Sequence, residues 1–264
     1  MRTRTWAKVA AGIAVLAVAV WWRVTHDPNE QDLLNRFSSP SLAAPFGTDG
    51  FGRDMLSRIV DGAVITIGAA STALAVTAVI GTTLGLFAAW RGGRTGSALL
   101  VVTDSLVAVP EVVVALIAVS IFGTNLGALM IAVIVVGWLP FARLSFELAS
   151  RVLGSDYAMA AQMTGTSSVR IVRFTLLPNV LRPLISLTFL RFPGRLLLLS
   201  GLSFLGLGPQ PPTPEWGAML ADGVEELERH PFVPLVPGLA IVLTGFAAAH
   251  LGRRLEAPAT GPTN

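Results

Sequence analysis

The chain has 264 residues, of which 53% are apolar and only 13% are charged, and its mean hydropathy is +0.67. A soluble domain usually has about 25% charged residues, so this composition predicts a membrane protein. The formal net charge is +3 and cysteine is absent, which excludes disulfide bonds and thiolate metal sites. Basic residues stand at the ends of apolar runs instead of forming one basic face, so they indicate membrane topology and not nucleic-acid binding.

Six apolar stretches approach the roughly 20 residues that a helix needs to cross a bilayer. They run approximately from Trp6 to Trp22, Ala63 to Trp90, Ala98 to Phe122, Leu126 to Ala142, Val180 to Leu205, and Phe232 to Leu251. The first stretch follows basic residues and ends in Trp-Trp-Arg without a small-residue cleavage site, so we expect an uncleaved anchor helix and not a cleaved signal peptide. The expected fold class is all-α, a polytopic membrane protein with six transmembrane helices.

With the N-terminus in the cytoplasm, alternation of the spans places residues 91–97, 143–179 and 252–264 on the cytoplasmic side. Most of the lysine and arginine residues then lie on that side, in agreement with the positive-inside rule. The predicted organisation is an N-terminal anchor helix and the start of an outer loop over residues 1–45, a transmembrane domain over 46–251, and a short cytoplasmic tail over 252–264. Both termini are therefore expected in the cytoplasm.

The outer loop between the first two spans contains the string GTDGFGRD. Its glycines have no strand before them and no helix of a βαβ unit after them, so the string is a weak match to a nucleotide site. We expect a tight turn, in which Gly47 and Gly50 adopt positive φ and Asp49 and Asp54 bond to nearby backbone groups.

Signs of catalysis are scarce in this sequence. The histidines His26, His230 and His250 lie far apart, and no G-x-x-x-x-G-K-[ST] phosphate loop is present. An intramembrane enzyme or a sensor, the alternative from a different functional class, would need paired catalytic groups at one depth, whereas Asp104 is the only aspartate in a predicted span. The chain is therefore expected not to be an enzyme.

The segment DYAMAAQMTGTSSVRIVRFTLLPN separates two apolar spans and is neither a span nor an ordinary polar loop. Asp156 can cap a short helix that ends at Gly165, a residue suited to the left-handed position after a helix. A second short helix, capped by one of the hydroxyl residues 166–168, is expected to end before Pro178, because the residue before a proline avoids the α region.

Small side chains give the first of these two helices a smooth face. Ala161 and Gly165 lie four residues apart, and Met159 and Met163 form a flexible apolar ridge beside them. A partner protein can approach such a face closely, and so can the protein's own helical bundle. The residues alone leave both interpretations open.

The same segment resembles the cytoplasmic coupling (EAA) loop of ATP-binding-cassette (ABC) importer permeases. The resemblance rests on Ala160-Ala161, on Gly165 after three further residues, and on Leu177-Pro178-Asn179 at the matching distance. Residues 45–250 as a whole resemble the second permease of the dipeptide, oligopeptide and nickel transporter family. The blocks that carry this resemblance are FGTDGFGRDMLSRIVDGA (46–63), TDSLVAVP, GWLPFAR (137–143), LSFLGLGPQPPTPEWGAML (202–220) and PGLAIVLT (237–244).

The resemblance implies a permease subunit of an ABC importer in the bacterial inner membrane, surrounded by lipid, with no catalytic site and no cofactor of its own. Its implied partners are a homologous permease that completes a heterodimer, two cytoplasmic subunits that bind ATP, and an extracytoplasmic solute-binding protein. The implied substrates are peptides or related small solutes. Uptake of nickel or of a metal chelator is the alternative within the same family.

The resemblance also assigns roles within the coupling loop. The residues implied to lie in the groove of the ATPase are Tyr157, Ala160, Ala161 and Gly165. Those implied to begin the next span are Leu177, Pro178 and Asn179. The chain departs from the family pattern at Met159, where the family has a glutamate, and at Thr175, where it usually has a histidine.

Two arginines, Arg191 and Arg195, lie on one face of the fifth predicted span. Each charge costs about 2.5–3.5 kcal/mol at the middle of a bilayer on the translocon scale, so something must compensate it. Asp104 and Glu111, seven apart on one face of the third predicted span, are the candidate partners, and Pro193 and Gly194 between the arginines can break the helix. The arginines then either make structural pairs or line a translocation path for substrates that carry carboxylates.

Overall fold

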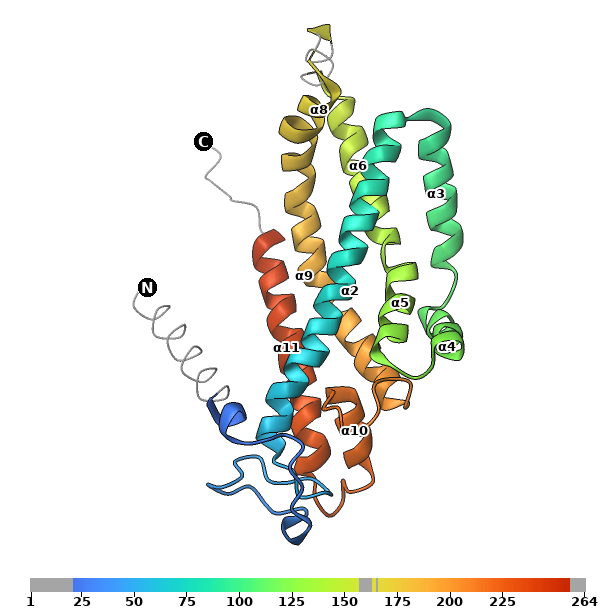
Figure 1. Ribbon diagram of the computed structural model, residues 1–264. Helices are drawn as coiled ribbons and strands as arrows, with labels where there is room; N and C mark the ends of the chain where they lie inside the picture. Colours follow the sequence, from blue (N-terminus) through green and yellow to red (C-terminus); the bar gives the residue numbers. More distant parts are fainter. Residues whose placement is uncertain (1–20, 157–162, 165, 257–264) are drawn as a thin grey trace, which may run out of the picture. The chain divides into compact units, whose positions relative to one another are not determined.

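The computed structural model describes residues 21–156, 163–164 and 166–256, and most of them are helical (Figure 1). The described part contains no β-strand beyond an isolated bridge between Thr48 and Asp54. The chain divides into two compact units. Unit 1 comprises Met1–Gly68 and Leu198–Leu243, and unit 2 comprises Ala69–Leu197 and Thr244–Asn264.

Four helices of the described residues are long and apolar enough to cross a membrane, and a bent pair of helices can count as a fifth. The four are α2 (Met55–Arg91), α5 with α6 (Leu126–Gly137 and Leu139–Leu153), α9 (Leu177–Phe204) and α11 (Phe232–Glu256). The bent pair is α3 (Gly93–Val107) with α4 (Glu111–Phe122). The all-α membrane class is thereby confirmed. The first predicted span lies almost entirely outside the described residues, so the count of six stays a prediction.

Helix α2 begins at Met55, well before the predicted start of its span at Ala63. Asp54 explains the early start, because its Oδ2 accepts a hydrogen bond from the backbone N–H of Ser57 at 2.7 Å, as a helix-capping side chain does. At 1.5 Å per residue, α2 is roughly 55 Å long and exceeds the thickness of a bilayer core. One end of α2 therefore extends beyond the hydrocarbon region.

Unit 1 holds the 3-10 helix η1 (Leu33–Asn35) and the short helix α10 (Trp216–Val224) beside its parts of the long helices. The predicted turn is present, and Gly47 has the expected positive φ of 75°. The second left-handed glycine is Gly52, at φ 73°, and not Gly50 as predicted. A side chain at position 52 would collide with the backbone of Asp32, a contact that the local sequence does not reveal.

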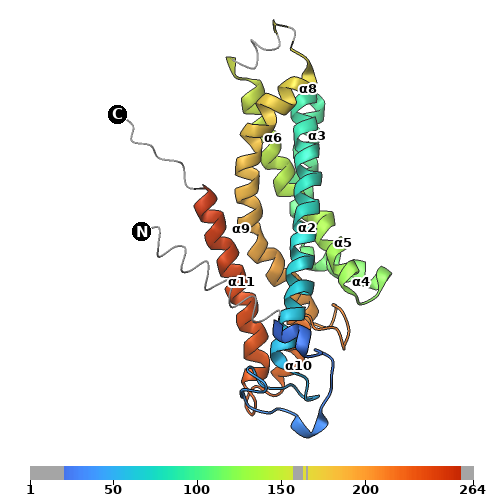
Figure 2. The same cartoon turned by 60° about the vertical axis from the view of Figure 1, so that its left-hand side comes forward.

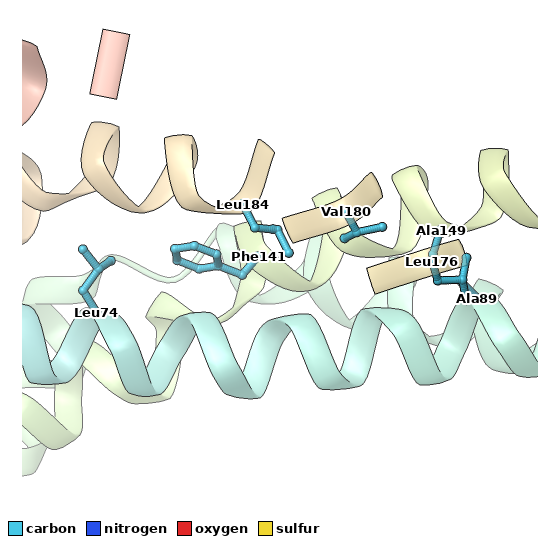
Figure 3. Close-up of a cluster of buried hydrophobic side chains, with 7 residues drawn as sticks. All are labelled: Leu74, Ala89, Phe141, Ala149, Leu176, Val180 and Leu184. Carbon is cyan, nitrogen blue, oxygen red and sulfur yellow. The ribbon is translucent and has the colours of Figure 1, made fainter. Parts of the chain in front are cut away.

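Unit 2 is a helical bundle in which α3 packs against α6 and α4 against α5 (Figures 1 and 2). After α6, the chain returns through α8 (Ser168–Ile171) and a π-helical turn, η2 (Val172–Leu176), into α9. Buried side chains from α2, α6, η2 and α9 form one hydrophobic cluster (Figure 3). Its members are Leu74, Ala89, Phe141, Ala149, Leu176, Val180 and Leu184.

Candidate coupling segment and membrane-embedded charges

The third predicted span is broken, and α3 and α4 meet at an angle of 83°. Pro110 has an extended backbone, with φ −63° and ψ 127°, and occupies the N-cap of α4. Because proline lacks an N–H and its ring clashes with the preceding turn, α3 ends before it. The prediction that Asp104 and Glu111 share one face of a single helix is therefore wrong, since the break separates them.

The predicted break inside the fifth span does not occur. Helix α9 runs without interruption from Leu177 to Phe204 with Pro183 and Pro193 inside it. Pro193 packs beside α11, where a Cβ atom at Gly245 would lie 3.6 Å from the Pro193 Cβ. The helix α9 thus continues through Pro193 at a contact with α11, although prolines weaken helices in general.

Arg195 and Glu111 form an ion pair that joins α9 to the first turn of α4. The Arg195 Nη1 lies 2.5 Å from the Glu111 Oε2, and the two side chains are 6% and 31% exposed. An acid in the first turn of a helix is also favoured by the helix dipole. Gly137 lies beside this pair at a close approach to α2, where a Cβ would lie 2.8 Å from Thr77 Cγ2 and 3.7 Å from Arg195 Nη2.

Asp104 has a partner that the sequence did not suggest. Its carboxylate forms an ion pair with Arg143 of α6, and Arg143 also contacts Glu147, with its Nε 3.2 Å from Oε1. These side chains are between 42% and 56% exposed. The expectation that Asp104 pairs with an arginine of α9 is wrong, because the bend after α3 leaves Asp104 beside α6.

Arg191 lies one helical turn before Arg195 and is exposed. Within the described part of the chain, no acid lies within ion-pair distance of its guanidinium. The two arginines of α9 therefore differ in environment. Arg195 is buried and neutralised, whereas Arg191 presents an uncompensated charge on the surface of unit 2.

Helices α2 and α6 cross at two glycines, Gly81 and Gly85, that lie four residues apart. A Cβ atom at Gly81 would lie 2.6 Å from the Cβ of Phe141, and one at Gly85 would lie 2.9 Å from the backbone nitrogen of Phe146. This is the small-xxx-small arrangement that lets membrane helices approach closely. Our reading of the sequence did not single out the string GTTLG, although its glycine spacing is the signal that identifies such a crossing.

The coupling loop is described only in part. The positions Tyr157, Met159, Ala160, Ala161 and Gly165 lie outside the described residues, so their predicted contact with an ATPase stays a prediction. Near this gap, Met163 is 90% exposed.

The return from the coupling loop is continuous helix, contrary to the prediction that a second short helix ends before Pro178. Ser167 accepts the first helical hydrogen bonds, from the backbone N–H groups of Arg170 and Ile171, within the predicted capping residues. Leu177 then has α-helical angles, φ −57° and ψ −46°. Pro178 stands in the first turn of α9, directly after a π-helical turn. Its nitrogen carries no hydrogen, but at this position no α-type backbone hydrogen bond is needed from it, so the helix accommodates the proline.

Buried side chains tie this return segment to the bundle. Ile171 is 2% exposed and Leu176 is fully buried, and Leu176 packs in the cluster with Ala149 of α6 and Ala89 of α2 (Figure 3). Phe174, by contrast, is 67% exposed. The segment therefore has one face fixed in the core and another face that is exposed.

In unit 1, Asp49 organises the motif FGTDGFGRDMLSR. Its Oδ1 accepts the backbone N–H groups of Phe51 at 2.8 Å and Arg53 at 3.0 Å. Its Oδ2 lies 2.6 Å from the Nε of Arg53 and 3.5 Å from the Nε of Arg58. The expectation that Asp49 and Asp54 bond nearby backbone is confirmed, and the two arginines extend Asp49 into a buried ion cluster.

The string PEWG docks α10 onto α2 and α9 within unit 1. Glu215 is 1% exposed, and its Oε1 accepts the hydroxyl of Thr66 at 3.0 Å while its Oε2 accepts the backbone N–H of Ala218 at 2.9 Å. Trp216 donates its indole N–H to the carbonyl of Ile59 at 3.0 Å. Only glycine fits at position 217, because a side chain there would collide with the backbone of α9 at Ser200.

Across the described residues, no group of three or more histidines and acids has the arrangement of a metal site. The geometry instead consists of bundled apolar helices, paired charges and a segment anchored on one face.

Comparison with known proteins identifies the class. Residues 81–257 match the family of binding-protein-dependent transport system inner membrane components, and the chain belongs to that family. It is therefore a non-catalytic, multi-pass permease subunit of an ABC transporter in the inner membrane. The predicted family resemblance is confirmed.

Individual relatives narrow the comparison. The chain is 34% identical over 250 residues to the di/tripeptide transport system permease protein DppC of Pseudomonas aeruginosa, covering 92% of this chain and 82% of the relative. It is 36% identical to the dipeptide permease DppC of Alkalihalophilus pseudofirmus, with 79% and 69% covered. It is 32% identical to the peptide permease SapC of Escherichia coli, with 92% and 84% covered.

Proposed function

We propose that the chain is one of two permease subunits of an ABC importer for peptides. The proposal is supported by its relatives, which are named as permeases of dipeptide, di/tripeptide or peptide transport systems. In this assembly, a homologous permease completes the translocation path, two ATP-binding subunits dock on the cytoplasmic side, and an extracytoplasmic binding protein delivers the substrate. Both termini of the chain lie in the cytoplasm. Import of nickel or a metal chelator, the alternative, has no relative named for it among those above.

The observation that carries the proposal is the anchoring of the coupling segment. Leu176 and Val180, which follow the loop, lie in one buried cluster with Ala149, which precedes it. A displacement of the loop by a bound ATPase then moves α6 and α9 together, because a close-packed core transmits displacement instead of absorbing it. This is the mechanical link that a non-catalytic subunit needs in order to use the ATP hydrolysed by its partners.

The membrane-embedded charges have separate roles in the proposal. Arg195 with Glu111 is a structural pair that fixes α4 against α9, since Arg195 is almost completely buried and already neutralised. Arg191 is the better candidate for the translocation path. Its exposed charge needs a polar surrounding at membrane depth, and the carboxylate of a passing peptide supplies one.

Reconstitution tests the proposal. The chain is purified with the second permease and ATPases encoded beside its gene, placed in liposomes, and supplied with the cognate binding protein and radiolabelled L-alanyl-L-alanine. We expect uptake that requires both ATP and the binding protein. Absence of peptide uptake by an ATPase-competent complex that imports a nickel chelate would overturn the peptide assignment in favour of the alternative.

A further inference from the structure

Unit 1 contains a cavity that the transport proposal does not use. Its volume is about 110 Å³, and it lies between the turn around Asp49, the start of α2, α10 and the start of α11. Apolar side chains form part of the wall, and Met55, Met219 and Val233 among them are at most 5% exposed. A cavity of this size accommodates one small molecule or one side chain, and not a long peptide.

Two buried arginines and Asp49 form the floor of the cavity. The side chains of Arg53 and Arg58 are 4% and 2% exposed, and both contact the carboxylate of Asp49. Asp49 is the carboxylate that both guanidinium groups contact, and Asp222 lies near enough to both to interact with them electrostatically. Arg58 donates further hydrogen bonds to the carbonyls of Pro28 and Pro212.

Arg53 is less completely bonded than Arg58. It donates through its Nε to Asp49, and its guanidinium carbon lies 4.6 Å from the centre of the Phe51 ring. Its two terminal nitrogens donate to no other group within the described part of the chain. The terminal N–H groups of Arg53 can therefore donate to a carboxylate that enters the cavity.

The mouth of the cavity is acidic. Asp222, Glu225 and Glu226 line it, and among the described residues none of them takes part in an ion pair. Partial burial raises the pKa of Asp222, while the nearby Arg53 and Arg58 pull it down and Asp49 pushes it up. The acids at the mouth and the arginines on the floor therefore face one another across a single space.

We propose that this cavity binds a small zwitterion with the head group of an amino acid, its carboxylate toward Arg53 and its ammonium toward Asp222 and Glu225. A simple anion would meet repulsion at the mouth, and a simple cation would leave the donors of Arg53 unused. An uncharged apolar molecule would bury charges without satisfying them. A zwitterion uses the whole lining, and the volume favours a single amino acid over a longer chain.

The test is direct binding to the purified transporter complex in lipid nanodiscs, without its solute-binding protein. Calorimetric titrations use L-alanine, acetate, methylamine and L-alanyl-L-alanine as probes. We expect L-alanine to bind at least roughly tenfold more tightly than acetate or methylamine, because each of these loses one charge-assisted contact. Equal binding of methylamine and L-alanine, or no saturable binding of L-alanine, would overturn the proposal.

Variants at the mouth locate the site without disturbing the buried floor. Asp222→Asn and Glu225→Gln should each weaken L-alanine about tenfold. Glu228→Gln, which changes an exposed acid on the same loop but outside the cavity lining, is the control and should leave binding unchanged. Equal affinity in wild type and both mouth variants would place any binding elsewhere and contradict the proposal.

The dipeptide arm tests whether both charges must belong to one residue. Weaker binding of L-alanyl-L-alanine than of L-alanine supports a free amino acid as the occupant. Tighter binding would overturn the proposal, because the ammonium and the carboxylate of a dipeptide stand on different residues. The measurement involves neither ATP nor uptake. A failure of the zwitterion site is therefore distinguishable from a failure of the peptide-import assignment.

Discussion

The carboxylate of Glu111, directly after the break that separates α3 from α4, meets the guanidinium of Arg195 on α9 at 2.5 Å. This pair holds the first turn of α4 against α9, so the apolar helix α4 has a fixed starting point after an 83° bend. The ion pair therefore compensates the charge of a buried arginine in a membrane-spanning helix.

Arg195→Met should destabilise the protein by roughly 3 kcal/mol, because removal of one partner from a largely buried pair leaves the other charge uncompensated. The measurement is the melting temperature of the purified protein followed by tryptophan fluorescence. Arg191→Met is the matched control, one turn away and exposed. It should melt like the wild type, and equal destabilisation by the two substitutions would contradict the distinction between them.

Arg191→Met should nevertheless lower peptide uptake in the reconstituted complex, since the proposal places this charge in the translocation path. The assay compares uptake of labelled L-alanyl-L-alanine at equal amounts of assembled complex. Normal uptake by an intact complex would remove Arg191 from the path.

Gly85→Leu should separate α2 from α6 and destabilise the bundle by about 3 kcal/mol, because a large side chain cannot enter the close crossing at Ala142 and Phe146. Gly68→Ala tests the same helix at a site with open space, where the change should be neutral or should stabilise by up to about 1 kcal/mol. Thermal melting measures both. If Gly85→Leu melted like the wild type, the claim that the close crossing of α2 and α6 stabilises the bundle would be contradicted.

Asp222→Asn should change stability in a pH-dependent way. Burial raises the pKa of Asp222 above its ordinary value of 3.8, so the folded state binds the proton more tightly than the unfolded state. Ionisation of Asp222 therefore opposes folding as the pH rises from 3.8 through the raised value. The variant should melt higher than the wild type at pH 7, and this difference should shrink as the pH falls toward 3.8. The raised pKa of Asp222 would be contradicted if the difference in melting temperature did not change with pH, or if the variant melted lower than the wild type at pH 7.

The class of fold was predictable because long apolar stretches have few alternatives to membrane helices. The behaviour of individual prolines was not. Pro110 and Pro193 both stand in apolar stretches, yet only Pro110 ends a helix, and Pro193 lies inside α9 where α11 packs beside it at Gly245. Tertiary packing influences which outcome occurs, and the residues next to each proline in the sequence do not reveal that packing.

The candidate site was predictable to a similar extent. The pairing of Arg195 with Glu111 was among the expected combinations, whereas the pairing of Asp104 with Arg143 depends on the bend after α3. The left-handed glycine at position 52, in place of Gly50, depends on a contact with the backbone of Asp32. Each missed feature involves partners distant in sequence.

The central claim is that the coupling loop binds an ATPase and passes its movement into the bundle. The most direct measurement is co-purification of the ATPase subunits with Gly165→Trp, together with peptide uptake. The control is Thr95→Trp, a substitution to the same residue at an exposed position in the first turn of α3, within the other predicted cytoplasmic segment. We predict that Gly165→Trp inserts into the membrane normally but loses both the ATPase subunits and uptake, while Thr95→Trp retains them. An intact, transporting complex in Gly165→Trp would show that the loop folds against its own bundle and would contradict the account.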